Sequence, residues 1–177
     1  MAMSTNHRSK NRHRLLAGHA GRWIWLAAIV GFMVVVLDAL SKWGIAQEIG
    51  PGAARSHFVL AGDFIELRYA VNSGVAFGLL RGNSTLAGVL VGLVIVPLVI
   101  VLAVMATRGP LWAVGGGLVV GGAAGNLLDR AGGGAVTDFI AVGRWPSFNF
   151  ADASITVGAL ILLGLSLIEQ RAHADTD

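Results

Sequence analysis

Four long apolar stretches, separated by polar segments of very different length, organise the chain. They cover residues 23–43, 86–106, 111–128 and 151–168. A helix rises about 1.5 Å per residue, so about 20 residues are needed to cross the hydrocarbon core of a bilayer. Each stretch approaches or reaches that length, and the pattern therefore predicts four transmembrane helices.

The third stretch carries a regular stripe of small residues. Gly117, Gly121 and Gly125 recur at every fourth position, which places them on one face of a helix. Small side chains let the backbones of two membrane helices approach closely. We therefore expect another helix to lie directly against this face.

The segments between the stretches differ sharply. Residues 107–110 form a tight turn, whereas residues 44–85 and 129–150 are long enough to form structure of their own. Residues 58–70 are rich in β-prone side chains in partial alternation. The expected fold is an all-α membrane protein, with four transmembrane helices and a small extracytoplasmic β-sheet.

Charge at the two ends predicts the orientation. Five of the thirteen Lys and Arg residues lie within residues 1–22, a polar segment that we expect to be a disordered cytoplasmic tail. Basic residues beside a first span stay in the cytoplasm. Four spans then place residues 171–177, after a membrane domain over residues 23–170, in the cytoplasm too. The ends of spans one and three and the start of span four lie outside.

Composition excludes several classes of protein and of site. Hydrophobic residues make up 55% of the chain and charged residues 13%, and the mean hydropathy is +0.71, which excludes an ordinary soluble domain. There is no cysteine and hence no thiol chemistry. Because the basic excess is concentrated in the tail, it indicates topology rather than nucleic-acid binding. The five histidines lack ligand spacing, so we expect no metal and no cofactor.

Acidic residues gather at the predicted outer side. Four of the ten acids in the chain lie at span ends or in the loop between spans three and four, beside three asparagines; these residues are Asp38, Asp129, Asp138, Asp152, Asn72, Asn126 and Asn149. A carboxylate near the hydrocarbon is costly, so it marks either a functional site or a paired structural charge. Several at one depth favour a polar site.

Two carboxylates that share one proton can activate water. The ionised one takes a proton from the water, and the protonated one polarises the scissile carbonyl. Asp129 precedes Arg130, whose charge suits a structural anchor, whereas Asp138 has apolar neighbours. Asp152 begins a helix, where a purely structural charge is the alternative. The residues favour Asp138 with Asp152 and leave the choice open.

Three other functions fit parts of the sequence. Ser41 and Lys42 suggest a serine–lysine peptidase, but adjacent helix residues do not face each other. A proton-coupled transporter also uses membrane aspartates, although its acids should be spread across the bilayer rather than gathered at one side. A structural membrane subunit would tolerate Asp138→Asn with little functional loss.

Five ordered motifs after residue 22 resemble the lipoprotein signal peptidase family, also called signal peptidase II. They are Asp38-Ala-Leu-Ser-Lys42, Asn72-Ser-Gly-Val-Ala-Phe-Gly78, Gly121-Gly-Ala-Ala-Gly-Asn-Leu-Leu-Asp-Arg130, Val136-Thr-Asp-Phe139 and Phe148-Asn-Phe-Ala-Asp152. The resemblance extends across nearly the whole chain after the tail. The longer basic tail and the glycines at 132–134 depart from the family pattern.

The resemblance implies an aspartic endopeptidase of the bacterial inner membrane, active at the outer face without a cofactor. Its substrate would be the signal peptide of a prolipoprotein, cut just before a diacylglyceryl-modified cysteine, with membrane lipid as a further partner and the monomer as the working unit. The family motifs assign catalysis to Asp138 and Asp152. Supporting or substrate-binding positions carry over to Asp38, Lys42, Asn72, Asn126, Asp129, Arg130 and Asn149.

Overall fold

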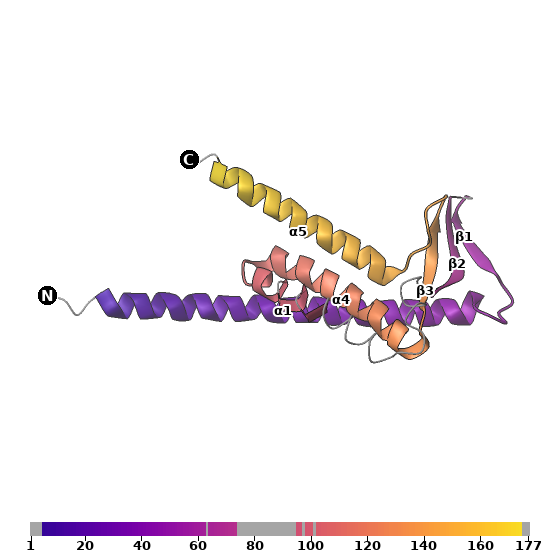
Figure 1. Cartoon of the computed structure of the whole chain (residues 1–177), viewed down its shortest axis with the longest axis horizontal. Helices are drawn as coiled ribbons and strands as arrows, with labels where there is room; N and C mark the ends of the chain where they lie inside the picture. Colours follow the sequence, from indigo (N-terminus) through magenta and orange to yellow (C-terminus); the bar gives the residue numbers. More distant parts are fainter. Residues whose placement is uncertain (1–4, 63, 74–94, 97, 101, 175–177) are drawn as a thin grey trace.

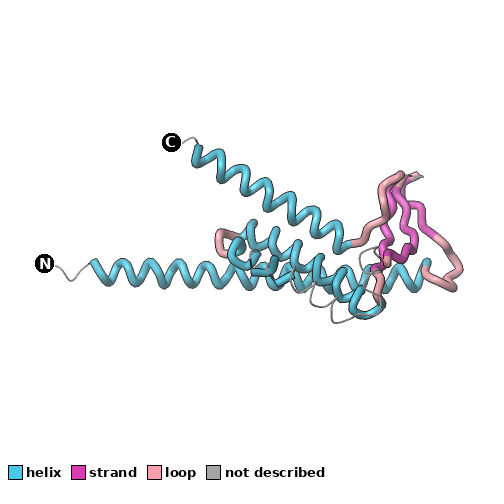
Figure 2. The backbone as a smooth tube through the Cα atoms, viewed as in Figure 1, coloured by secondary structure: helices cyan, strands magenta, loops and turns pink. Residues whose placement is uncertain are grey.

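A computed structural model shows helices α1, α4 and α5 beside one another, with a small sheet at one end of them (Figure 1). The structure describes residues 5–62, 64–73, 95–96, 98–100 and 102–174. The chain runs from α1 through strands β1 and β2 to α4, and then through β3 to α5. Figure 2 shows how the loops join these elements at the sheet end.

Three helices are long and apolar enough to cross a membrane, counted over the described residues. They are α1 (Thr5–Ile49), from Arg22 onward, α4 (Pro110–Gly133) and α5 (Phe150–Ala174). Each contains one of the predicted spans and continues beyond it. Proline opens α4, where its missing N–H costs nothing. At the other end Gly134, with φ 73°, closes the helix in the left-handed conformation.

The second predicted span, residues 86–106, lies largely outside the described residues. Residues 95–96, 98–100 and 102–106 of this stretch are helical. The predicted tight turn follows them, since the N–H of Thr107 donates to the carbonyl of Val104 and the N–H of Arg108 to that of Met105.

The basic tail differs from the sequence expectation. Residues 5–22 are helical and continue into the first span, whereas the sequence predicts disorder over residues 1–22. Arginine, lysine, leucine and alanine are good helix formers. Extending a helix that the span has already nucleated adds one hydrogen bond for each residue fixed.

The glycine stripe of α4 lies directly against α1, as predicted. A Cβ added to Gly117 would lie 2.6 Å from the carbonyl oxygen of Ala27, and one added to Gly121 would lie 2.5 Å from that of Gly31. On another face of α4, Gly122 approaches the carbonyl of Ala151 in the same way. The middle helix thus contacts both neighbours through backbone, which explains why it needs glycine at these positions.

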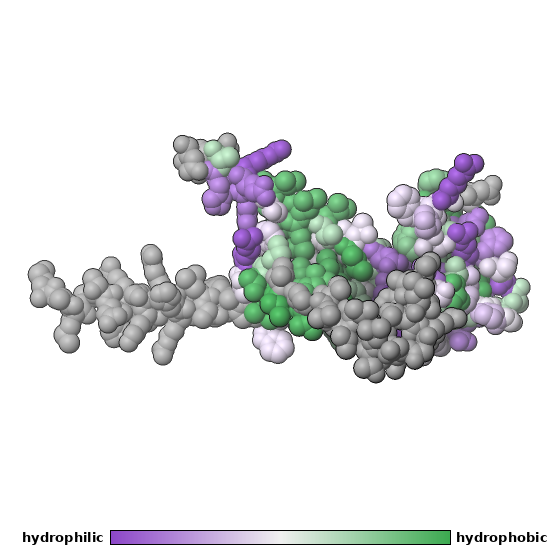
Figure 3. Space-filling view, viewed as in Figure 1, coloured by the Kyte–Doolittle hydropathy of each residue, from purple (hydrophilic) through white to green (hydrophobic). Residues whose placement is uncertain are grey.

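The helices present apolar side chains to their surroundings. Leu160, Leu163 and Leu167 of α5 are exposed, and Figure 3 shows a hydrophobic surface along the helices between polar ends. In water such a surface would be unfavourable, whereas in a bilayer the lipid chains cover it.

The sheet is antiparallel, with the strand order β1-β2-β3. Strands β1 (His57–Ala61) and β2 (Ile65–Asn72) fall where the alternation predicts them. Strand β3 (Val136–Val142) comes from the loop between α4 and α5 and pairs Asp138 with Ala70 of β2. Sequence reasoning missed β3, although its run of Val, Thr, Phe and Ile is typical of a strand.

Candidate active site

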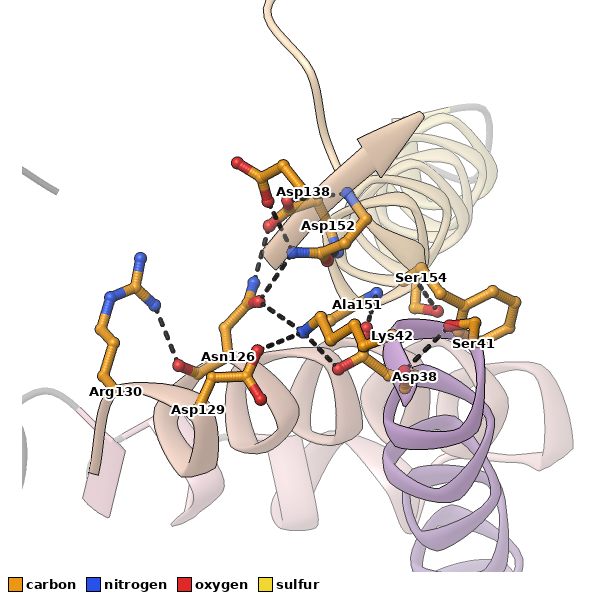
Figure 4. A network of polar contacts seen from close by, with 12 residues as sticks. Asp38, Ser41, Lys42, Asn126, Asp129, Arg130, Asp138, Ala151, Asp152 and Ser154 are labelled. Carbon is orange, nitrogen blue, oxygen red and sulfur yellow. Dashed lines mark hydrogen bonds and ion pairs between the residues drawn. The ribbon is translucent and has the colours of Figure 1, made fainter. Parts of the chain in front are cut away.

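The structure gathers the predicted polar residues where the helices meet the sheet (Figure 4). Asp38 and Lys42 come from α1, and Asn126, Asp129 and Arg130 come from α4. Asp138 lies on β3, Asp152 lies in the first turn of α5 and Asn72 ends β2. Asn149, the ninth predicted site residue, directly precedes α5. Five of the nine are buried: Asp38, Lys42, Asn126, Asp138 and Asn149.

A short connection brings β3 and α5 together. After β3 the chain turns back, and Phe148 pairs with Ile140 through hydrogen bonds of 2.8 and 3.0 Å. The next residue, Asn149, therefore lies beside the strand that carries Asp138, and α5 begins immediately after it.

Asn149 and Asp152 form a capping box at the start of α5. The N–H of Asp152 donates to Asn149 Oδ1 at 2.9 Å, and the N–H of Asn149 donates to Asp152 Oδ2 at 3.2 Å. This reciprocal pair satisfies two N–H groups that a helix start otherwise leaves without partners. It also fixes the carboxylate of Asp152 against the backbone of Asn149, at the start of α5.

The amide of Asn149 joins the two aspartates. Its Nδ2 donates to Asp138 Oδ1 at 2.8 Å and to Asn126 Oδ1 at 3.0 Å. Asn126 Nδ2 in turn donates to Asp152 Oδ1 at 2.7 Å. The other oxygen of Asp138, Oδ2, accepts a hydrogen bond from Asn72 Nδ2 at 3.0 Å. All four oxygens of Asp138 and Asp152 thus accept an N–H.

Asp138 lies in surroundings that favour its neutral form. Burial raises the pKa of this carboxyl above its ordinary value, and the negative charge of Asp152 acts in the same direction. The hydrogen bonds from Asn72 and Asn149 and the charge of Lys42 oppose this change without reversing it. Asp138 therefore retains a proton at higher pH than an exposed aspartate does.

A second cluster of charges, between α1 and α4, lies next to this network. Lys42 Nζ lies 2.5 Å from Asp38 Oδ2 and 2.6 Å from Asp129 Oδ2. Asp38 Oδ1 also accepts the backbone N–H of Ala151 at 3.0 Å and so ties α1 to the first turn of α5. Gly125 makes room for this carboxylate, because a Cβ there would lie 2.9 Å from Asp38 Oδ2.

Asp129 has a different charged partner from the one that its sequence neighbour suggests. Its carboxylate lies against Lys42, while Arg130 Nη1 donates to the carbonyl of Asn126 at 3.1 Å. The anchoring role expected of Asp129 thus involves α1. Successive residues on a helix point in different directions, so the charge next to Asp129 in sequence differs from the one that its carboxylate contacts.

Two contributors to the site were not predicted as site residues. They are the N–H of Ala151 and the missing side chain of Gly125. Gly125 stands in the stripe that sequence reasoning assigned to helix packing alone, and it directly precedes Asn126. The backbone contact of Ala151 leaves no signal in residue type, because every residue except proline carries an N–H.

Ser41 and Lys42 do not form a pair. Ser41 Oγ donates to the carbonyl of Asp38 at 2.8 Å, whereas Lys42 is directed at the two carboxylates. Among the described residues, no three His, Asp or Glu side chains are grouped so that they could hold a metal ion.

Comparison with known proteins gives a consistent result. The family model described as "Signal peptidase (SPase) II" matches residues 30–168. The chain is 42% identical to a lipoprotein signal peptidase of Syntrophomonas wolfei over 77% of its own length and 89% of that relative. It is 39% identical to one of Rhodococcus jostii, over 81% of this chain and 73% of the relative.

Solved structures agree with these matches. The chain is similar to a bacterial membrane enzyme determined at 1.9 Å resolution, with a TM-score of 0.65 and 27% identity over 80% of this chain and 92% of that one. A second bacterial membrane enzyme, at 2.3 Å resolution, gives a TM-score of 0.64 and 25% identity over 83% and 90% of the two chains.

Proposed function

The chain belongs to the signal peptidase II family, and we propose that it cleaves its substrates with water activated between Asp138 and Asp152. It is an aspartic protease that removes the signal peptide from prolipoproteins, and its apolar helices place it in a membrane. The substrate in this proposal is a precursor whose cysteine already carries a diacylglyceryl group. The enzyme cuts the peptide bond just before that cysteine.

One observation carries the choice of the two aspartates. A single asparagine, Asn149, binds Asp138 through its amide and Asp152 through both its backbone N–H and its side-chain oxygen. Strand β3 and helix α5 are thereby held so that the two carboxyl groups share one network. Asp38 and Asp129 instead share an ion pair with Lys42, which suits a supporting role.

The two carboxyl groups have different surroundings and take different roles. Asp152 lies in the first turn of a helix, where negative charge is favoured, so we assign it as the carboxylate that acts as general base. Asp138 is buried, with a raised pKa, and holds the shared proton. A carboxylate at a helix start beside a buried, protonated carboxyl suits general base and general acid work.

The reaction then follows in two balanced steps. Asp152 takes a proton from water as the water oxygen bonds to the scissile carbonyl carbon, and Asp138 gives its proton to the carbonyl oxygen. The tetrahedral diol collapses when its carbonyl re-forms and returns a proton to Asp138. The C–N bond breaks as Asp152 delivers its proton to the leaving nitrogen, and both groups regain their starting state.

The site also fits the position of the substrate. A diacylglyceryl chain anchors the scissile bond at the membrane surface, so the carboxyl groups must lie at that depth. We place four spans in residues 23–170, both termini in the cytoplasm and the site at the outer face, supported by the basic residues of the tail and the grouping of the acids at one end. The monomer provides every residue of this network.

A proton-coupled transporter is the main alternative, and the position of the acids argues against it. Asp38, Asp129, Asp138 and Asp152 share one network at the sheet end. Glu169, near the other end of α5, pairs with Arg108 and Trp112. A relay needs acids at intermediate depth, whereas a peptidase needs them together at one surface.

The deciding assay incubates the purified protein with a diacylglyceryl-modified prolipoprotein and follows the mobility shift on cleavage. Wild type should cleave, whereas Asp138→Asn and Asp152→Asn should each abolish cleavage and leave the fold intact. Asp129→Asn serves as the comparison and should slow cleavage without abolishing it, because Asp129 supports the site through Lys42 rather than activating water. If Asp129→Asn alone were inactive while the other two cleaved, the assignment of the pair would be wrong.

A further inference from the structure

Lys42 reaches the proposed pair through a single intermediary. Its ammonium has three N–H donors, and three acceptors surround it: Asp38 Oδ2 at 2.5 Å, Asp129 Oδ2 at 2.6 Å and Asn126 Oδ1 at 3.3 Å. The side chain is only 8% exposed. Lys42 thus donates hydrogen bonds to Asp38 and Asn126 and forms an ion pair with Asp129, and Asn126 is the residue that contacts Asp152.

Two donors fix which way the amide of Asn126 points. The Lys42 ammonium can only donate, so the atom facing it must be the oxygen. Asn149 Nδ2 donates to the same oxygen at 3.0 Å. The orientation of Asn149 is itself certain, because its Oδ1 faces the backbone N–H of Asp152. The remaining group of Asn126, its Nδ2, must then face Asp152 Oδ1.

We propose that Lys42 is a positioning residue, which holds the amide of Asn126 with its N–H toward Asp152 and thereby makes Asp152 the charged member of the pair. The inference rests on the proposed function, since it concerns how the two carboxyls share their proton. With the amide reversed, an oxygen would face Asp152 and favour its protonated form. Lys42 thus decides which carboxyl activates the water without touching the substrate.

Other charges surround the network and must be held constant in a test. They are Asp38 on α1, Asp129 and Arg130 on α4, and Asp138 on β3. Removing Lys42 alone leaves Asp38 and Asp129 without their shared cation. The net charge near Asp152 then becomes more negative by one. The double variant Lys42→Met/Asp129→Asn loses one positive and one negative charge, so it removes the donor to Asn126 at constant net charge.

The test measures kcat and KM across pH for full-length protein in detergent, with a diacylglyceryl-modified prolipoprotein as substrate. The charge-balanced variant should lose at least about tenfold in kcat, with KM changed by less than about threefold. The acid limb of its pH profile should move to higher pH. Arg108→Met, which removes a cation paired at 3.2 Å with Glu169 near the other end of α5, should leave kcat and the profile unchanged.

A double-mutant cycle shows whether Lys42 acts through Asn126. Asn126→Asp keeps an oxygen toward Lys42 and Asn149 and replaces the N–H toward Asp152 by a second oxygen. If Lys42 acts through this amide, adding the charge-balanced change to Asn126→Asp should cost less than about threefold more. Losses that multiply, or an acid limb that stays in place, would overturn the proposal.

Two further outcomes are distinguishable. If the charge-balanced variant does not fold, Lys42→Met/Asp38→Asn takes its place in the same cycle, because it removes the same donor at the same net charge and keeps an oxygen toward the N–H of Ala151. If Asp138→Asn and Asp152→Asn both remain active, the proposed pair itself is wrong. If both are inactive while the Lys42 variants keep the wild-type pH profile, only the positioning role fails.

Discussion

Gly121→Ala tests whether the contact between α1 and α4 sets the geometry of the site. The added methyl would lie 2.5 Å from the carbonyl oxygen of Gly31, 2.8 Å from its Cα and 2.9 Å from Val34 Cβ. Favourable contacts between such atoms lie at about 3.5–4.0 Å. Since two of the three obstacles are backbone atoms, the helices must separate by about 1 Å at this point.

The separation has a stability cost that can be estimated. Inserting a methyl group into a tightly packed site costs about 1–3 kcal/mol. Alanine in place of glycine returns at most about 1 kcal/mol of helix propensity. We therefore expect a net loss of about 1–2 kcal/mol of unfolding free energy, measured as a lower midpoint of thermal or denaturant unfolding in detergent.

The same separation should reduce catalysis. The ion pair between Lys42 and Asp129 joins α1 to α4 at 2.6 Å, and a shift of about 1 Å would exceed hydrogen-bonding distance. Gly164→Ala on α5 is the matched control, because a Cβ there meets nothing within 4 Å. It should leave activity unchanged and raise the free energy of unfolding by at most about 1 kcal/mol, through helix propensity alone. A Gly121→Ala enzyme as stable and as active as Gly164→Ala would refute the close packing on which this reasoning depends.

Three further outcomes follow from the site. Because burial raises the pKa of Asp138, the folded state binds its proton more tightly than the unfolded state, and stability falls as pH rises from the unfolded to the folded pKa. Asp138→Asn should therefore be inactive, and its stability should no longer fall as pH rises through this range. Unfolding midpoints measured below and above the range would show this, and a variant whose stability still falls as in wild type would contradict the assignment. Asn149→Ser should keep the helix cap but lose the bridge to Asp138, and so lose cleavage, whereas Asn149→Ala should also lose about 1 kcal/mol of stability. A chelator should not change the cleavage rate, and inhibition reversed by added metal would count against two-carboxylate chemistry.

The sequence by itself determined three of the membrane helices and the candidate acids. Lipid selects spans by local composition, so runs of apolar residues identify α1, α4 and α5 without knowledge of the fold. The cost of placing a carboxylate near lipid likewise singles out Asp38, Asp138 and Asp152 from residue type and position alone. These properties depend on a few neighbouring residues and on the solvent around them.

Only the tertiary structure decided how those acids are paired. Asp38 meets Ala151 across 113 positions of sequence, and Asn72 meets Asp138 across 66. The third strand and the contact of Asp129 with Lys42 were missed for the same reason, since each depends on an element from elsewhere in the chain. A hydrogen bond is set by distance and direction in space, and adjacency along the sequence fixes neither once helices and strands have packed together.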